Sequence, residues 1–360
     1  MPKFQFWLPT NLTRIQQRAV ESRKPIFLSG VPGTGKTVVS IMRLKNAASL
    51  GKKAIIFTYG KLLRKTIEEK LENNPNTPVN NIHKWMWDVQ GGGKRLYLQD
   101  FTSDKNLQSS IEKLKSLNIE FDEILIDEGQ DLSINSYKIL KELTSGLSVS
   151  ADNAQQINNR EEATNEEEII ELLPALKRFE LDDIFRSAYE IYHFAIQFVA
   201  YNARANSIEL LERLKRKNSG ADKPLVYLEK NLNAMHQSVR DIINENPTDN
   251  IGILFEQVLH VDTFANNLEN EYEVSKYHNQ EIIPSELHNI IVTTFKSAKG
   301  VEFDVVIIPY FTDGAKNIAE EYYVGVTRAK NQVHILCIND LPDMMSGFNK
   351  STYELIDNRG

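Results

Sequence analysis

Short runs of consecutive apolar residues alternate with longer amphipathic segments along the whole chain. Each run has the length of a buried strand, and the segments between them carry apolar residues at helical spacing. Strands that alternate with helices indicate the α/β class, because parallel neighbours need crossover connections. In the first half of the chain, the runs that we expect to form strands are 25–29, 54–58, 124–126 and 147–151.

The second half shows the same alternation after an acidic segment at 161–171. That segment is typical of a solvated loop and helix start, and it marks the approach to a domain boundary near 172–178. We therefore expect two α/β domains, residues 1–178 and 179–360. The strands expected in the second domain are 225–228, 251–255, 290–294, 305–308 and 333–336.

The stretch GVPGTGKT fits the phosphate-loop pattern of a glycine, any four residues and Gly-Lys-Thr, and it lies between a predicted strand and a predicted helix. Its glycines allow backbone N–H groups to turn inward around phosphate oxygens. In this pattern Lys36 reaches the β- and γ-phosphates, and the Thr37 hydroxyl binds Mg²⁺. The context disfavours the alternative, an ordinary glycine turn. The expected loop residues are Gly30, Val31, Pro32, Gly33, Thr34, Gly35, Lys36 and Thr37.

Two adjacent acids, Asp127 and Glu128, directly follow the aliphatic run 124–126. A buried strand delivers them to the carboxyl edge of a parallel sheet, where ligands bind in open α/β folds. Asp127 is suited to hold Mg²⁺, and Glu128 to orient and deprotonate an attacking water. An acid pair after a strand means little alone, but together with the phosphate loop it indicates nucleotide hydrolysis.

The bulk properties are those of an ordinary globular protein: of 360 residues, 41% are hydrophobic and 25% are charged. The formal net charge of −7 argues against indiscriminate coating of nucleic acid, but it allows a local basic groove. Cys337 is the one cysteine, which excludes a disulfide framework and a cysteine zinc site. We expect a cytoplasmic protein, since no signal peptide or membrane-spanning run is apparent.

Trp85 and Trp87 stand beside basic residues. Two tryptophans next to positive charges are suited to stack on nucleic-acid bases. The alternative is that they belong to the hydrophobic core, which is the commoner arrangement. The sequence leaves both interpretations open.

With these motifs placed, the chain resembles the superfamily 1 helicases, and its pattern is most similar to the UvrD, Rep and PcrA group. The resemblance covers nearly the whole length, with motifs in the family's order. Segment 124–131 (ILIDEGQD) ends in a Gln-Asp pair typical of this group, and 294–304 (TFKSAKGVEFD) and 323–330 (YVGVTRAK) are the most specific matches. The resemblance implies two RecA-like parallel-sheet domains of the P-loop NTPase type, with the ATP site in the cleft between them.

The resemblance also implies roles for individual residues. It makes Gln16 the adenine reader, whereas from the residues alone either Gln16 or Gln17 is an ordinary surface glutamine. The implied catalytic set is Lys36, Asp127, Glu128, the γ-phosphate sensor Gln155, and the arginines Arg186 and Arg328. The further implied nucleotide contacts are Phe185, Gly300 and Glu302. The implied nucleic-acid contacts are Thr58, Tyr59, His83, Thr294 and Lys296, and Trp85 is added to them as the stacking residue considered above.

Two departures from the family pattern bear on function. Ala151 replaces a usual glycine, and Asn158 stands near a usual aromatic residue, which weakens the case for base stacking at that motif. The large accessory domains are missing or reduced: a short insertion at about 88–121 replaces the first, and about ten residues near 280–288 replace the second. This pattern predicts a two-domain motor that translocates well and unwinds duplex poorly without a partner.

The leading hypothesis is therefore an ATP- and Mg²⁺-dependent translocase or helicase on single-stranded nucleic acid. The resemblance implies DNA rather than RNA, and movement from 3′ to 5′. A second hypothesis is a nucleotide-gated regulatory or scaffold ATPase that acts through a partner protein, such as a nuclease in repair or defence. A small-molecule phosphotransferase is disfavoured, because the two arginine motifs and the Gln130-Asp131 pair have no purpose there.

Overall fold

The computed structural model divides the chain into two compact units. The first unit is Phe6–Asp183, and the second combines Ile184–Gly360 with the N-terminal Met1–Gln5. Each unit contains one parallel sheet with helices, which confirms the predicted α/β fold class. The structure describes residues 2–6, 8–30, 33–58, 60–72, 74–82, 84–85, 88, 104–118, 120–151, 164–183, 188–199, 211–212, 214–216, 219–278, 283–314 and 318–360.

The first unit contains a six-stranded sheet in the order β3-β2-β4-β5-β1-β6, in which every neighbouring pair is parallel. Because β4, β5 and β1 are neighbours and parallel, their carboxyl ends reach the same edge of the sheet. The strands are β1 (Ile26–Ser29), β2 (Ala54–Thr58), β3 (Val79–Asn81), β4 (Glu123–Ile126), β5 (Leu147–Ser150) and β6 (Lys177–Glu180).

The central strands of this sheet form because their apolar residues are buried on both faces. Every residue of β2, β4 and β5 is buried, and alternate side chains such as Phe57 and Ile126 enter one hydrophobic cluster with α7. Each large apolar side chain buried in this way contributes about 1.5–3 kcal/mol. The strands predicted for the first half of the chain are confirmed.

Trp85 belongs to this same cluster. Its residue is 6% exposed, and its ring meets the Phe57 ring edge-on, with 5.1 Å between the ring centroids. This burial favours the core interpretation of Trp85, and its contact with nucleic acid stays a prediction. Trp87 lies outside the described residues.

Three helices of the first unit, α1, α7 and α8, begin at a residue whose side chain caps the helix. Thr13 caps α1: its hydroxyl accepts from the Gln16 backbone N–H at 3.2 Å, and the Gln16 side chain accepts from the Thr13 N–H at 3.0 Å. The helices are α1 (Arg14–Val20), α2 (Lys36–Ser49), α3 (Lys61–Lys70), α6 (Asp104–Ser116), α7 (Ile134–Leu140) and α8 (Glu166–Leu172), with a 3₁₀ turn at Gly129–Asp131.

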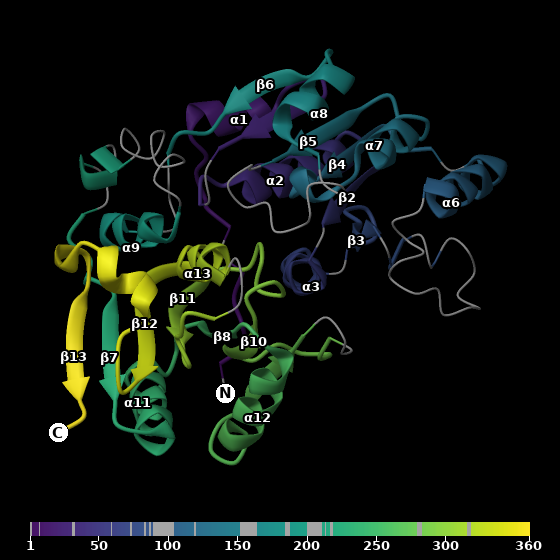
Figure 1. Ribbon diagram of the computed structural model, residues 1–360. Helices are drawn as coiled ribbons and strands as arrows, with labels where there is room; N and C mark the ends of the chain where they lie inside the picture. Colours follow the sequence, from purple (N-terminus) through teal and green to yellow (C-terminus); the bar gives the residue numbers. More distant parts are fainter. Residues whose placement is uncertain are drawn as a thin grey trace. The chain divides into compact units, whose positions relative to one another are not determined.

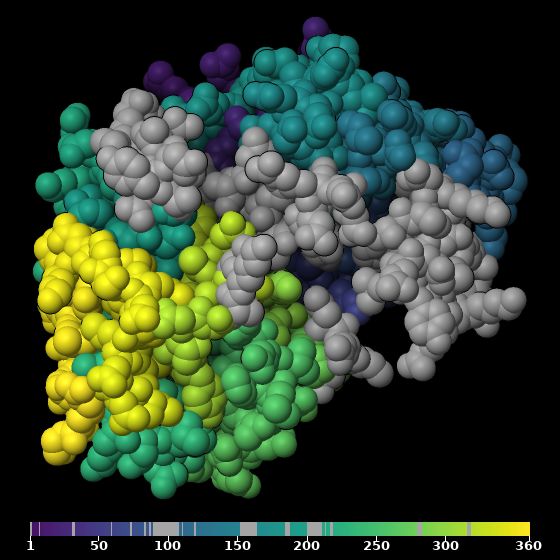
Figure 2. Space-filling model, in the orientation of Figure 1, coloured from purple at the N-terminus to yellow at the C-terminus, as the bar shows by residue number. Residues whose placement is uncertain are grey.

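The second unit contains a seven-stranded sheet in the order β13-β7-β12-β11-β8-β10-β9, again with parallel neighbours. Figure 1 shows β13, β7 and β12 side by side, and the C-terminal residues around β13 lie on the surface, in yellow, in Figure 2. The strands are β7 (Leu225–Glu229), β8 (Ile251–Phe255), β9 (Val274–Tyr277), β10 (Ile290–Thr294), β11 (Phe303–Ile308), β12 (Ala329–Ile338) and β13 (Glu354–Asn358).

Helices cover both faces of this second sheet. Alternate residues such as Ile253 and Val305 pack in one cluster with α11 and α12, whereas Leu254, which points the other way, lies against Gly325 of α13. Within the described residues, no helix is long and apolar enough to cross a membrane. The helices are α9 (Tyr189–Ala195), α11 (Leu232–Glu245), α12 (Val258–Leu268) and α13 (Ile318–Val326), with 3₁₀ turns at Ile196–Phe198, Asp343–Gly347 and Lys350–Thr352.

The first residues of the chain pack on the second unit. The Phe4 N–H donates to the Leu287 carbonyl at 2.9 Å, and the Phe4 ring lies edge-on to Phe303 at 5.9 Å between centroids. Gln5 exchanges two hydrogen bonds with the Asn250 side chain, at 3.1 and 3.0 Å. The chain therefore passes between the units twice, after Gln5 and after Asp183. The second crossing lies beyond the expected boundary at 178, because β6 pairs with β1 and so belongs to the first unit.

Candidate active site

The phosphate-loop sequence forms a tight connection between β1 and α2. Gly35 caps α2 in the left-handed region, with a φ of 86°, and a side-chain carbon there would lie 2.7 Å from the Gln16 amide nitrogen. The Lys36 ammonium donates to the Gly30 carbonyl, so the side chain turns back over the loop. Val31 and Pro32 lie outside the described residues. The described part of the loop has the turn and the helix N-terminus that a phosphate site requires.

Gln16, rather than Gln17, is directed at this loop. Gln16 is buried, and its amide donates to the Thr34 carbonyl at 3.1 Å, while its oxygen holds the cap of α1. Gln17 is exposed and donates to Glu21 at 2.9 Å. The structure therefore resolves the ambiguity that the sequence left: Gln16 connects α1 to the phosphate loop, and Gln17 faces solvent.

Asp127 lies beside the phosphate loop at the carboxyl end of β4. The Thr37 hydroxyl donates to Asp127 Oδ2 at 2.8 Å, although the two motifs are far apart in the sequence. The Ser150 hydroxyl, at the end of β5, donates to Asp127 Oδ1 at 2.6 Å. Both carboxylate oxygens are thus held in place, one by the loop helix and one by the neighbouring strand.

Burial dominates the electrostatics of this aspartate. Burial, the largest cause, and the adjacent Glu128 raise the pKa of Asp127, whereas the hydrogen bonds from Ser150 and Thr37 and the Lys36 charge lower it, and the net pKa is about 6. A buried carboxylate with this environment is stabilised by a nearby cation. The hydroxyl of Thr37 and the carboxylate of Asp127 are hard oxygen donors, which are the ligands that Mg²⁺ prefers.

The number of protein donors at this site also fits Mg²⁺. Among the described residues, no group of three or more His, Cys, Asp or Glu side chains could hold a metal ion. Mg²⁺ does not require such a cage, because it keeps several waters and binds one or two protein oxygens together with substrate phosphates. A pair of hard oxygen donors such as Thr37 and Asp127 is therefore compatible with Mg²⁺.

Glu128 adopts a backbone conformation that is uncommon for a residue with a side chain, with φ 58° and ψ 47°. The Gln130 amide donates to Glu128 Oε2 at 2.6 Å, and Tyr137 donates to the Gly129 carbonyl at 2.7 Å. There is no room for a side chain at Gly129, since a carbon there would lie 2.4 Å from the Tyr137 hydroxyl. These contacts hold a tight turn that carries the second acid away from the strand.

The expected residues of the second unit lie at the ends of its strands, some at carboxyl ends and some at amino ends. Thr294 ends β10, and its hydroxyl lies 3.0 Å from the Ser297 hydroxyl. The Lys296 side chain is 60% exposed and lies 3.5 Å from Glu321. Arg328 is buried, and its Nε donates to the Val324 carbonyl at 3.0 Å.

Two further expected residues of this unit lie in the segment between β10 and β11. Gly300 has a φ of 82°, in the left-handed region. Glu302 lies 4.0 Å from Lys330.

In the first unit, Thr58 is buried at the end of β2, with its hydroxyl donating to the Gly60 carbonyl at 3.2 Å. The expected residues Tyr59, His83, Gln155, Phe185 and Arg186 lie outside the described residues, and their roles stay predictions.

Ser150 is the contact that sequence reasoning missed. The strand 147–151 was expected from its apolar residues, and Ser150 was included in it without a role. The available signal was a small hydroxyl residue at the end of a buried strand, where a donor needs a partner. Only the pairing of β5 with β4 shows that this partner is Asp127.

Both units are similar to known proteins. A family model described as an AAA domain matches residues 15–159, and one described as a UvrD-like helicase C-terminal domain matches residues 289–336. The RecBCD enzyme subunit RecB of Chlamydia pneumoniae is 32% identical over 88 residues, which is 22% of this chain and 8% of RecB. The matched stretch thus spans a small part of that relative. The C-terminal domain of a possible DNA helicase from Lactobacillus plantarum WCFS1, a crystal structure, is 19% identical with a TM-score of 0.38, over 48% of this chain and 99% of that domain.

Proposed function

We propose that the chain uses ATP to move along single-stranded nucleic acid, as a UvrD-like superfamily 1 helicase does. The support comes from the model described as an AAA domain, which matches the first unit, from the one described as a UvrD-like helicase C-terminal domain, which matches the second, and from the similarity to RecB. The observation that carries the proposal is the 2.8 Å contact between Thr37 and Asp127. This contact joins the phosphate loop to the acid strand, which is the arrangement that nucleotide hydrolysis needs.

The chain's own residues supply three parts of the proposed reaction. The loop from Gly30 and the N-terminus of α2 bind the phosphates, and Lys36 contacts the β- and γ-phosphates once it leaves the Gly30 carbonyl. Thr37 and Asp127 hold Mg²⁺, which when bound neutralises charge that develops on the phosphates. Glu128 orients the attacking water and accepts its proton.

Three residues complete the proposed nucleotide contacts by resemblance alone. Gln155 is proposed to sense the γ-phosphate, and Arg186 and Arg328 to neutralise charge on it. An arginine in that role contributes on the order of 10³–10⁵ in rate. The loss of the γ-phosphate would then change what the arginines bind, which is the step that we propose to be coupled to movement along the strand.

The nucleic-acid part of the proposal rests on the resemblance and on the exposed Lys296 beside Thr294. A lysine with 60% of its side chain exposed can neutralise a backbone phosphate without a large desolvation cost. DNA as the strand and movement from 3′ to 5′ are proposed from the family alone.

A single assay tests the proposal: ATP hydrolysis by the full chain with single-stranded DNA, single-stranded RNA, duplex and no nucleic acid, at low salt. We expect single strands to stimulate hydrolysis, and Glu128→Gln to lower kcat by about 10²–10⁴ while ATP still binds. A chain that binds no ATP, or whose hydrolysis ignores every strand, would contradict the proposal.

The second hypothesis, a nucleotide-gated regulatory ATPase, predicts a different pattern in the same experiment. Strands would not stimulate hydrolysis, and binding to a partner protein would require ATP but would persist in Glu128→Gln. Stimulation by single strands that disappears in Glu128→Gln would instead favour the translocase.

A further inference from the structure

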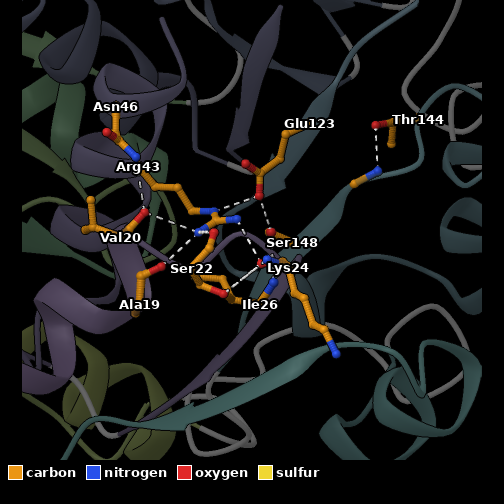
Figure 3. A network of polar contacts seen from close by, with 11 residues as sticks. Ala19, Val20, Ser22, Lys24, Ile26, Arg43, Asn46, Glu123, Thr144 and Ser148 are labelled. Carbon is orange, nitrogen blue, oxygen red and sulfur yellow. Dashed lines mark hydrogen bonds and ion pairs between the residues drawn. The ribbon is translucent and has the colours of Figure 1, made fainter. Parts of the chain in front are cut away.

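A buried arginine of α2 connects the segments that carry the candidate nucleotide site. The residue Arg43 is 5% exposed, and Figure 3 shows its guanidinium surrounded by oxygens of α1, the following turn and β4. Its Nε donates to Glu123 Oε1 at 2.7 Å. Its terminal nitrogens donate to four backbone carbonyls at 2.8, 3.3, 2.9 and 3.0 Å, those of Ala19, Val20, Ser22 and Lys24.

The carbonyl contacts satisfy the C-terminal end of α1. The last carbonyls of any helix have no partner within the helix, and when they are buried they need another donor. Arg43 supplies that donor for Ala19 and Val20, and it continues into the turn that leads to β1. The planar guanidinium presents five N–H groups in a fixed fork, so one side chain sets the position of the whole helix end.

The carboxylate partner extends the network across the sheet. Glu123 starts β4, and its Oε1 also accepts from the Ser148 hydroxyl of β5. Ser148 in turn accepts from the Ile26 N–H, at the start of β1, at 3.0 Å. The network therefore lies at the amino ends of the three neighbouring strands whose carboxyl ends carry the phosphate loop, Asp127 and Ser150.

The position of α1 matters because of the residue at its other end. Gln16 lies in the first turn of α1 and donates to the Thr34 carbonyl of the phosphate loop at 3.1 Å. The loop leads into α2, which carries Arg43 further along. Thus polar contacts connect α1 to the loop through Gln16 and to α2 at the opposite end through Arg43, where Asn46 adds a 3.5 Å contact to the Val20 carbonyl and Ala19 and Val20 pack with Val39.

We propose that Arg43 is a positioning residue for base recognition: by holding the C-terminal end of α1 on α2 and β4, it keeps Gln16 in register with the phosphate loop. This inference rests on the proposed function, in which the loop binds ATP and Gln16 contacts its adenine. Arg43 itself touches no part of the nucleotide in this proposal. Its effect reaches the base through α1.

The test compares two probes on the full chain in the presence of Mg²⁺: ATP, which has a base, and inorganic tripolyphosphate, which has none. We measure the ratio of their dissociation constants by calorimetry for the wild type, Arg43→Lys, Gln16→Ala and the double variant. Lysine keeps the charge but cannot form the fork. The matched control is Lys45→Met, which removes a charge from an exposed position of the same helix.

We expect Arg43→Lys to lower the preference for ATP over tripolyphosphate by about 3- to 10-fold, the equivalent of one hydrogen bond. Tripolyphosphate binding should stay unchanged, and Lys45→Met should change neither probe. Gln16→Ala should lower the same preference, and adding Arg43→Lys to it should have no further effect, because both act at the same contact.

Three outcomes are informative. If Arg43→Lys weakens the binding of ATP and of tripolyphosphate equally, Arg43 acts on the fold alone and the inference is overturned. If Gln16→Ala lowers the ATP preference and Arg43→Lys does not, the inference fails while the proposed function stands. If the wild type binds neither probe, the proposed function fails first. Should Arg43→Lys not fold by far-ultraviolet circular dichroism, Glu123→Gln, which removes the charge opposite Nε, is judged by the same ratio.

Discussion

In the absence of ligands, the buried carboxylate of Asp127 should lower the free energy of unfolding of the first unit, and replacing this residue should raise it. Burial and, second to it, the adjacent Glu128 raise its pKa from an ordinary value of 3.8 to about 6, because low-polarity surroundings and a neighbouring negative charge both penalise the charged form. A difference of about two pKa units corresponds to about 3 kcal/mol at pH values where the folded carboxylate is ionised. Asn has the same shape and no charge, so Asp127→Asn removes this penalty. It also retains much of the hydrogen bonding to Thr37 and Ser150, whose hydroxyls can both donate and accept.

The pH dependence follows from the direction of that change. Below about pH 4 the carboxyl is protonated in both the folded and the unfolded chain, and there is no penalty. Between about pH 4 and 6 the unfolded chain loses its proton while the folded chain keeps it, so stability falls as the pH rises. Above about pH 6 the folded carboxylate is ionised as well, and the full penalty remains.

The assay is urea unfolding of the full chain without Mg²⁺ or nucleotide, at pH 5 and pH 8, followed by a probe in the first unit. We expect Asp127→Asn to raise the free energy of unfolding by about 1–3 kcal/mol at pH 8 and by less at pH 5. The control is Glu142→Gln, whose exposed pair with Lys115 at 3.1 Å contributes little. A variant that is less stable than wild type at pH 8, or a gain that does not change with pH, would refute this reasoning.

Three further predictions concern individual contacts. Ser150→Ala removes one of the hydrogen bonds that orient Asp127, so the Mg²⁺ concentration for half-maximal ATP hydrolysis should rise about tenfold; an unchanged Mg²⁺ dependence would contradict this role. Phe4→Ala should destabilise the second unit by about 2 kcal/mol, less than a core substitution because a chain end can detach; proteolysis that is no faster in that unit would argue otherwise. Lys296→Ala should weaken single-strand binding and lower by about one the slope of the log binding constant against log salt concentration, whereas Trp85→Phe should leave the affinity and this slope unchanged. Binding titrations at several salt concentrations measure both quantities and test the prediction.

The strands that the sequence predicted and those that it missed differ in their place in the sheets. The central strands were predicted, because both of their faces are buried and most of their residues are therefore apolar. The four missed strands are β3, β6, β9 and β13, and these are the outermost strands of the two sheets. An outermost strand has one unpaired edge and carries polar residues, as β6 does with its sequence KRFE. Its residues show no apolar run from which to predict it.

The candidate site divides in the same way. The phosphate loop and the acid pair were identified from the sequence, because their chemistry requires fixed residue types at short spacing. The choice between Gln16 and Gln17, the burial of Trp85 and the contact from Ser150 were not. Each of these depends on which side chain faces which neighbour, and neighbouring residues in a chain can point to opposite sides.

The sequence alone thus determined the fold class, the core strands and the residue types of the nucleotide motifs, since these follow from local patterns of apolar residues and from invariant spacing. The shared Mg²⁺ role given to Thr37 and Asp127 already implied that these two meet, as they do. The tertiary structure alone decided which other distant residues meet: Ser150 with Asp127, and Arg43 with Glu123. The physical reason is that parallel pairing of β1, β4 and β5 sets the register of strands that are far apart in the chain. No local pattern records that register.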